Sequence, residues 1–477
     1  MKVSRTGWLA AKQSVPGGDR PPQTHGCCFS PVPGPPSASG TAGHAKGLRW
    51  SLTVFLTIAG LVIAPHATGQ KIAFRRAMEL ALQHSAGVGV ALADQMRSRQ
   101  GYLETRNMYI PQLTFGSGVG QTWGYPMSIE GSAPSIFNVT SQSYLLNFAN
   151  RDAMRAARTD WHAADLSFEN QRQSALLEAA LTYLQLEQAG TKLQTLQQES
   201  DEAGRLEAIS QARLKEGIDS KLDVTRARLN AARLRLRLAE AQGSTDLLRQ
   251  RLAQLTGLDA REIETDPASV PQPPQIDPHE NMEARALANS PAVKAADERA
   301  RAAELHARSE RRQAYPAVDL VANYGLFTKY NNLNLLFPNG QFSRNNATLG
   351  IAIRLPFLNA AERSRAAAAE ADLLRAQKLA ETAREQVASE TLRLQRSVQQ
   401  LEAARDVAQL EQELAQTKAE AAQAEATAGN GTIRDQENAR LETSEKRAAL
   451  LDAQFELDRA RLQLLRTTGG LEAWALP

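Results

Sequence analysis

Hydrophobic and polar positions alternate with a period of two in four segments of this chain. In "ATLGIAIRLPF", Leu349, Ile351 and Ile353 point one way, while the small or polar residues between them point the other. This alternation predicts β-strands, although a strand of a soluble sandwich gives the same signal. The predicted strands cover residues 112–124, 136–148, 317–330 and 342–357.

A seven-residue hydrophobic period marks the longest segments, and it predicts helices that supercoil against neighbouring helices. The period runs through Val387, Leu394, Leu401 and Ala408, through Leu450, Leu457 and Leu464, and through Leu222, Leu229 and Leu236. The predicted helices cover residues 73–108, 151–215, 221–255, 282–313, 360–428 and 433–466. At 1.5 Å per residue the longest would reach about 90–100 Å, which no compact domain needs.

The two halves of the chain follow one plan. "ALQHSAGV" (81–88) resembles "ALANSPAV" (286–293), and a single offset of 212 positions places Gly217 on Gly429, Ser220 on Thr432 and Asp223 on Asp435. We therefore expect a duplicated unit of helix, strand pair and helical hairpin. The predicted divisions are a first repeat at 70–258, a Pro-rich linker at 259–280, a second repeat at 281–470 and a C-terminal tail at 471–477.

The N-terminal region has the features of export processing. The apolar run "LTVFLTIAGLVIA" follows basic residues, so we predict a signal peptide at 46–69, with a retained membrane anchor as the alternative. Residues 1–45 are rich in Pro, Gly and Ser, and we expect them to be disordered or absent from the natural product. Both cysteines, Cys27 and Cys28, precede the predicted cleavage point, which leaves none in the mature chain.

Composition argues against an enzyme and against a nucleic-acid-binding protein. Aromatic residues make up only 5% of the chain, and the net charge of +3 is too small for a polyanion-binding surface. The histidines beyond the leader are scattered without the spacing of metal ligands, and no nucleophile or phosphate-binding motif stands out. We therefore predict no catalytic residue, no cofactor and no metal. These histidines are His84, His162, His279 and His306.

A glycine interrupts each long helical stretch just before the helix resumes. Gly217 and Gly429 can adopt positive φ, and Ser220 and Thr432 are suitable N-caps for the returning helix. Each stretch is therefore predicted to be a tight reversal within a helical hairpin. A purely structural turn explains these residues, including a carboxylate in the first turn of each returning helix.

Four strands are too few to close a membrane barrel, because the smallest transmembrane barrels contain eight. If these strands span a membrane, their edge groups must be satisfied by other chains. Several copies would then share one barrel.

The complete arrangement, with "RLKEGIDSKLDVTRAR" at the first tip, resembles the TolC family of outer-membrane efflux proteins over roughly residues 72–470. The resemblance implies a mainly α fold with a small β part. Three chains would form a twelve-stranded β-barrel in the outer membrane of a Gram-negative bacterium. Duplicated coiled-coil hairpins would continue it as a helical tunnel through the periplasm, closed where the hairpins converge.

The resemblance also assigns roles to residues at the tips. Asp435 corresponds to an aspartate facing the pore constriction, and Asp223 to a partner of the latch that holds the tip shut. Asn438 and Gly431 depart from the family pattern, where a second aspartate and an arginine stand, so Arg434 is a candidate substitute cation. The expected adaptor-contacting tips comprise Gly217, Ile218, Ser220, Gly429, Gly431 and Thr432.

These features predict the outer-membrane exit duct of a tripartite efflux or type I secretion system. Its partners would be two further copies of the chain, a periplasmic adaptor, an inner-membrane transporter and outer-membrane lipid. The alternative is a periplasmic adaptor with one coiled hairpin, which does not explain why the plan occurs twice. A coiled-coil scaffold would leave the strands without a purpose.

Overall fold

The structure is a computed structural model, and it describes residues 71–117, 135–273, 281–327, 345–356, 359–428 and 433–476. The described residues all belong to one compact unit, Pro65–Pro477. The predictions for 1–45 and 46–69, and those for Gly429, Gly431 and Thr432, lie outside the described residues.

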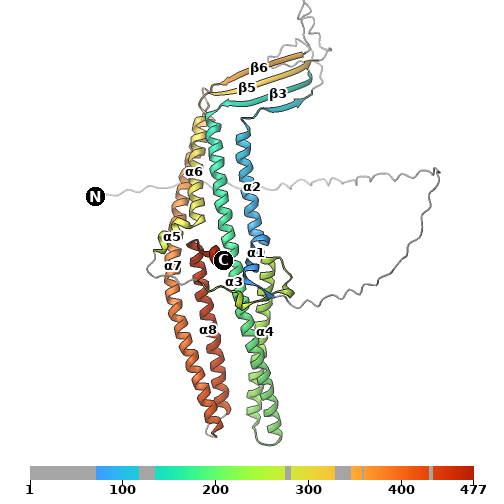
Figure 1. Cartoon of the computed structure of the whole chain (residues 1–477), viewed down its shortest axis with the longest axis vertical. Helices are drawn as coiled ribbons and strands as arrows, with labels where there is room; N and C mark the ends of the chain where they lie inside the picture. Colours follow the sequence, from blue (N-terminus) through green and yellow to red (C-terminus); the bar gives the residue numbers. More distant parts are fainter. Residues whose placement is uncertain are drawn as a thin grey trace, which may run out of the picture. The chain divides into compact units, whose positions relative to one another are not determined.

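Long helices dominate the fold, in the order that the repeat predicts (Figure 1). α3 Phe148–Lys215 and α7 Ala360–Thr427 contain 68 residues each, and they are followed by α4 Lys221–Thr256 and α8 Ile433–Thr467. The other α-helices are α1 Phe74–His84, α2 Ala86–Asn107, α5 Met282–Asn289, α6 Pro291–Arg312 and α9 Leu471–Ala475. None of the helices within the described ranges is both long enough and apolar enough to cross a lipid bilayer.

Each repeat opens with two helices where the sequence pattern predicts one, so the single helices expected at 73–108 and 282–313 are wrong. α1 and α2 are separated at Ser85, and α5 and α6 at Ser290, which have extended ψ angles of 120° and 117°. Pro291 explains the second break, because proline disfavours helical geometry in the preceding residue. Ala86 follows Ser85, so the break recurs in the first repeat without a proline.

The four predicted strands form one antiparallel sheet in the order β2-β3-β5-β6. Their bounds are β2 Gln112–Gly116, β3 Ser135–Leu146, β5 Ala317–Phe327 and β6 Asn345–Arg354. The β3–β5 pairing joins the two repeats, with Ser141 beside Ala322. Within the described residues, β2 and β6 each pair on one side only, so the sheet has two open edges.

The core includes parts of the segments that the sequence predicts to be a linker (259–280) and a C-terminal tail (471–477). Phe74 of α1 packs edge-to-face against Tyr183 of α3 and Trp474 of α9, with ring centroids 5.3 and 5.2 Å apart. The Tyr183 hydroxyl donates to the Ile72 carbonyl at 2.7 Å and accepts from the Asp266 amide at 2.8 Å. β4 Glu264–Thr265, from the Pro-rich segment, pairs in parallel with β1 Lys71–Ile72. The short helices η1 Ala260–Glu262 and η2 Pro267–Ser269 flank β4.

Candidate functional site

The sheet has one apolar face and one polar face, which follow from its register. Leu113 lies beside Ser141, Ser141 beside Ala322, and Ala322 beside Leu349, so these side chains share a face. The same face carries Phe115, Phe137, Val139, Leu320, Ile351 and Ile353, and the opposite face carries Gln112, Thr114, Asn138, Thr140, Gln142, Asp319 and Arg354. Leu349 is 78% exposed, although it is a large hydrophobic residue. A continuous exposed apolar face of this kind fits contact with lipid or with another chain.

The polar face is fixed by a buried carboxylate. Asp319 is only 2% exposed, and its Oδ2 atom accepts hydrogen bonds from Gln142 Nε2 at 3.1 Å and Arg354 Nη2 at 3.0 Å. These contacts link β3, β5 and β6. They hold the strands together at the end of the sheet that leads into the helices.

The first hairpin ends in a turn with a capping box. Gly217 has φ of 79°, and the Ser220 side chain accepts from the Asp223 amide at 3.2 Å. Asp223 Oδ2 in turn accepts from the Ser220 amide and hydroxyl, at 3.2 and 2.5 Å. The hydrogen bond from the Ser220 side chain, followed by that from its amide, holds the pKa of Asp223 below its ordinary value. This geometry supports the structural-turn alternative for Asp223, while its predicted latch role stays a prediction.

Asp435 and Asn438 lie at the start of α8, and both side chains are exposed. Asp435 is in the first turn of the helix, where the sequence pattern placed it. Arg434 precedes it in the same turn. The backbone therefore agrees with the repeat, and the gating roles of these residues stay predictions.

Contacts between the two hairpins were not predicted from the sequence. Arg440 of α8 pairs with Glu202 of α3 at 3.9 Å, and Glu445 of α8 pairs with Arg237 of α4 at 3.3 Å. Farther from the tips, Asp452 of α8 contacts Lys192 and accepts from Gln188 Nε2 at 3.1 Å. The charges are visible in the sequence, but their pairing depends on how α8 lies against the first hairpin. All of these contacts connect the two repeats, and those of Arg440 and Glu445 are the nearest to the predicted gate.

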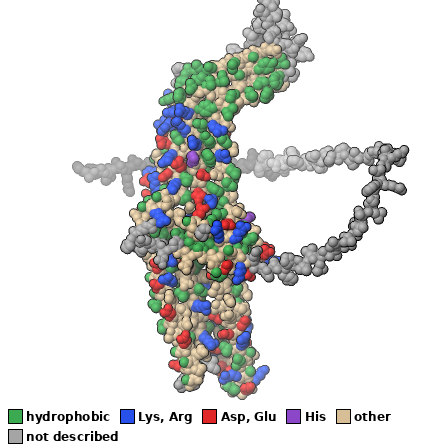
Figure 2. All heavy atoms as spheres, in the orientation of Figure 1, with side chains coloured by type: hydrophobic (Ala, Val, Ile, Leu, Met, Phe, Trp, Pro, Cys, Tyr) green, Lys and Arg blue, Asp and Glu red, His purple; other side chains and the backbone are tan. Residues whose placement is uncertain are grey.

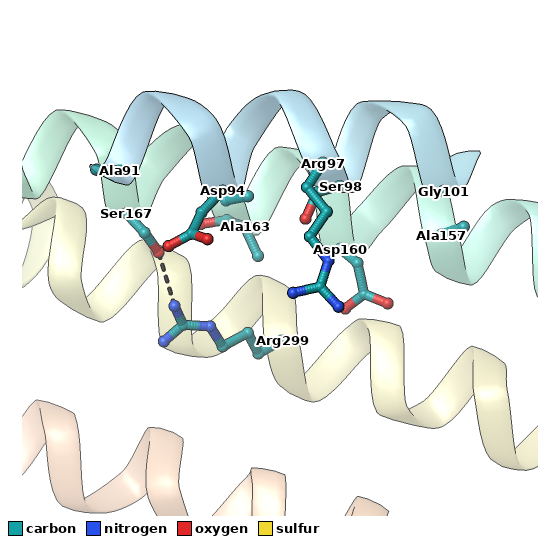
Figure 3. A pocket seen from close by; sticks show the side chains of 11 residues that line it. Ala91, Asp94, Arg97, Ser98, Gly101, Ala157, Asp160, Ala163, Ser167 and Arg299 are labelled. Atoms are coloured by element: carbon teal, nitrogen blue, oxygen red, sulfur yellow. Dashed lines mark hydrogen bonds between the residues drawn. The ribbon is translucent and has the colours of Figure 1, made fainter. Parts of the chain in front are cut away.

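A polar cavity of about 560 Å³ lies between α2, α3 and α6 (Figure 3). Figure 3 shows Arg97 of α2 pointing toward Asp160 of α3, and Asp94 of α2 pointing toward Ser167 of α3. Arg299 of α6 donates to Ser167 Oγ at 2.8 Å. Two carboxylates and two guanidinium groups line it, so their charges balance. In the described part of the chain, no three His, Cys, Asp or Glu side chains are grouped to hold a metal ion.

A model of the family described as "Outer membrane efflux protein" matches residues 77–258 and 284–470. These two ranges correspond to the two repeats. Protein CyaE of Bordetella pertussis is 26% identical over 319 residues, which cover 65% of this chain. The match spans 66% of CyaE, just under two thirds of its length.

Solved structures show the same fold. The outer membrane protein VceC of Vibrio cholerae superimposes with a TM-score of 0.65 and 21% identity, over 83% of this chain and 96% of VceC. The CmeC outer membrane channel of Campylobacter jejuni gives a TM-score of 0.69 and 15% identity, over 83% of this chain and 86% of CmeC. The predicted mainly α fold with a small sheet and the resemblance to TolC-like proteins are thus confirmed. The chain belongs to the outer membrane efflux protein family, which places it in the outer membrane and supports an exit duct over a periplasmic adaptor.

Proposed function

We propose that three copies of this chain form one gated duct, which receives substrates from a periplasmic adaptor and an inner-membrane transporter and releases them outside the cell. The observation that carries this proposal is the open four-stranded sheet with its exposed apolar face. Backbone groups at a lipid-exposed edge must find partners, because the membrane interior offers no water. Three such sheets joined edge to edge would satisfy both edges of every copy and place the apolar face against lipid.

Cross-linking between the two sheet edges tests this arrangement. Gln112 of β2 and Ala352 of β6 lie on the polar face, at the ends of the edge strands nearest the helices. With Cys27 and Cys28 lost in the predicted leader, Gln112→Cys and Ala352→Cys would supply the cysteines of the mature chain. A short bis-maleimide should then link the double variant into dimers and trimers and nothing larger, because a head-to-tail ring closes at three.

Each single variant is the matched control, and neither should form a trimer ladder. A double variant that stays monomeric, in a membrane fraction where the protein is folded, would contradict the shared barrel. A ladder that continues past three copies would contradict the ring.

We infer that Asp435 forms the constriction of this duct. One carboxylate from each of three chains would make a ring that attracts cations and resists anions. Asp435→Ala should raise conductance in planar bilayers and weaken block by multivalent cations. Asn438→Asp should strengthen that block, because it would add a second carboxylate one turn along α8.

Asp201→Ala is the control for charge loss. Asp201 is also an exposed aspartate, but it lies in α3 about 20 Å from the end of that helix. If Asp435→Ala leaves both conductance and cation block at the values of Asp201→Ala, the constriction lies elsewhere.

The hairpin tips are proposed to contact the adaptor. Ile218 is 61% exposed beside Gly217, so the first tip presents an apolar side chain to a partner. Ile218→Asp should abolish export while trimers still assemble. It is a cleaner probe than a bulky residue at Gly217, because side chains are strained at positive φ. If Ile218→Asp exports at the normal level, Ile218 does not contribute to the contact with the adaptor.

A further inference from the structure

Arginines crowd the ends of α3 and α6 that lie next to the sheet. Arg151, Arg155 and Arg158 are in the first turns of α3, and Arg308 and Arg312 are in the last turns of α6; we call these five the arginine belt. Arg158 is ten residues after the start of α3, which is about 15 Å along the axis. The belt therefore lies immediately below the sheet.

The belt occupies one face of the helical layer. Arg151, Arg155 and Arg158 recur at i, i+4 and i+7, so they lie on one side of α3. Arg155 and Arg312 both pair with the buried carboxylate of Asp152, at 3.4 and 2.8 Å, which brings the two rows together. Ala157, Asp160 and Ala164, which line the polar cavity, lie on the opposite side of α3 at 100° per residue. The belt and the cavity therefore face opposite sides of the layer.

Basic side chains at the helix ends next to the sheet lie on the same side of the chain as the apolar surface of the sheet (Figure 2). Figure 2 shows Lys and Arg side chains gathered on the helix ends directly below the hydrophobic band that covers the sheet. Both are on the face in view. A membrane that covers the apolar band would therefore have its polar headgroups at the level of these basic side chains, which is where α3 and α6 carry the belt.

Positive charge in the belt exceeds the negative charge that neutralises it. Asp152 alone pairs with both Arg155 and Arg312, and Glu304 pairs with Arg308 at 2.9 Å. Arg151 and Arg158 are exposed and form no ion pair with any residue that the structure describes. α3 and α6 are also the inner helices of the layer α2-α3-α6-α7, so assembly through the edge helices would leave the belt uncovered.

We propose that the arginine belt binds the phosphate groups of phospholipids in the outer-membrane leaflet that faces the periplasm. This proposal rests on the proposed placement of the sheet in the membrane. Guanidinium groups form paired hydrogen bonds with phosphate, and their long side chains can bend toward a membrane surface. Lipid is the favoured source of the phosphate because the belt continues the apolar face and points away from the cavity.

Spin-label measurements in reconstituted vesicles test the proposal. The mature protein is placed in phosphatidylcholine vesicles with a trace of spin-labelled phosphatidylglycerol or spin-labelled phosphatidylcholine, and the protein-associated fraction of each is measured. We expect the wild type to prefer phosphatidylglycerol about threefold, because basic residues at a membrane surface attract anionic lipid. R151Q/R158Q/R308Q should bring the ratio close to one, and 1 M salt should do the same to the wild type.

Arg155 and Arg312 are left unchanged in this variant because they neutralise buried Asp152. R205Q/R233Q/R447Q is the matched control, since these three arginines are exposed in the hairpins beyond the belt. It should keep the wild-type ratio. A wild-type ratio of one, or an unchanged ratio in R151Q/R158Q/R308Q, would overturn the proposal.

Calorimetry with inorganic phosphate separates the two sources of the ligand. Binding of inorganic phosphate to the detergent-solubilised wild type but not to R151Q/R158Q/R308Q, with a lipid ratio of one, would assign a free anion instead of a membrane. The protein-associated fraction of spin-labelled phosphatidylcholine, measured by itself, reports whether the protein has inserted into the vesicles. A protein that fails to insert contradicts the proposed duct, whereas one that inserts without preferring anionic lipid contradicts only the belt.

Discussion

α3 and α7 are equivalent helices of the two repeats, yet one is central and the other lies at an edge. Each has 68 residues and follows an asparagine that caps it, Asn147 or Asn359. Fifteen residues of α3 are buried, but only five of α7. α3 packs against α1, α2, α4, α6, α8 and α9, whereas α7 packs against α5, α6 and α8. The same sequence plan therefore yields a helix that the chain covers itself and a helix that needs a further neighbour.

The opposite edge of the chain carries a matching surface. Leu222, Leu229 and Leu236 follow the seven-residue period along α4, and each is at least half exposed. α7 exposes Leu374, Leu379, Leu392, Val407, Leu410 and Leu414. Supercoiling helices bury residues with this period, so α4 of one copy is a suitable neighbour for α7 of the next.

The largest effect is expected from charges placed on the α7 edge. L410E/L414E should abolish trimer formation, because it would bury two carboxylates in the interface without partners. Q412E/Q416E adds the same charge on the opposite side of α7 and should assemble normally. Sedimentation of the detergent-solubilised proteins measures the outcome, and trimers of L410E/L414E would show that this edge is not an interface.

A matched pair of leucines tests whether side chains of α3 contribute more to the free energy of unfolding than side chains of α7. Leu176 of α3 is 1% exposed, so Leu176→Ala should lower the free energy of unfolding by about 2–5 kcal/mol. Leu392 of α7 is 51% exposed, and Leu392→Ala should cost below about 1 kcal/mol. Both are compared by urea denaturation in the L410E/L414E background, where assembly does not contribute. Equal losses would contradict the distinction between centre and edge.

The periodic signals predict this fold well because they depend on local contacts. The seven-residue period and the Gly-Ser turn locate α3 and α4 within three residues, and alternation locates β6. The same period cannot say what covers a position: Leu457 is 2% exposed, while Leu229 is 50% exposed. Trp474 in the predicted tail was missed for a similar reason, since its partner Phe74 is at the other end of the chain. Pairings between the hairpins depend on the packing of distant segments, which one sequence does not encode as a local pattern.

The Ser220 cap in the turn of the first hairpin should stabilise the start of α4. Ser220→Ala removes the acceptor for the Asp223 amide, and loss of such a cap costs about 0.5–2 kcal/mol. Hydrogen exchange should show faster opening at the start of α4. Thr225→Ala changes a hydroxyl that bonds back to the Lys221 carbonyl in the same helix, and it should have little effect. Identical exchange rates in the two variants would show that the Ser220 cap does not stabilise the start of α4.

A pair of carboxyl groups makes the contact between α3 and α8 sensitive to pH. Burial raises the pKa of Glu187 and that of Asp458, and the charge of Asp458 raises the pKa of Glu187 further. The folded protein then holds protons that the unfolded chain releases, so stability should fall as pH rises through the raised pKa values. Asp458→Asn should raise the melting temperature more at pH 7.5 than at pH 5. Asp452→Asn on the same helix should give no such gain, because Asp452 is exposed and pairs with Lys192. A gain that does not depend on pH would contradict this explanation.

The smallest expected change compares two arginines at equivalent positions of the repeats. Arg228 pairs with Glu207 inside the first hairpin at 3.6 Å, whereas Arg440 pairs with Glu202 of the other hairpin at 3.9 Å. Both arginine side chains are more than half exposed, and Glu207 keeps Arg235 as a second partner at 3.0 Å, so each glutamine variant should cost below about 1 kcal/mol of stability. Only Arg440→Gln loosens a contact between hairpins, and it should raise the open fraction in single-channel recordings while Arg228→Gln leaves it unchanged. The difference should shrink in high salt, because exposed charges are screened. An equal rise in both variants would mean that gating responds to loss of charge in general and not to the tie between the two repeats.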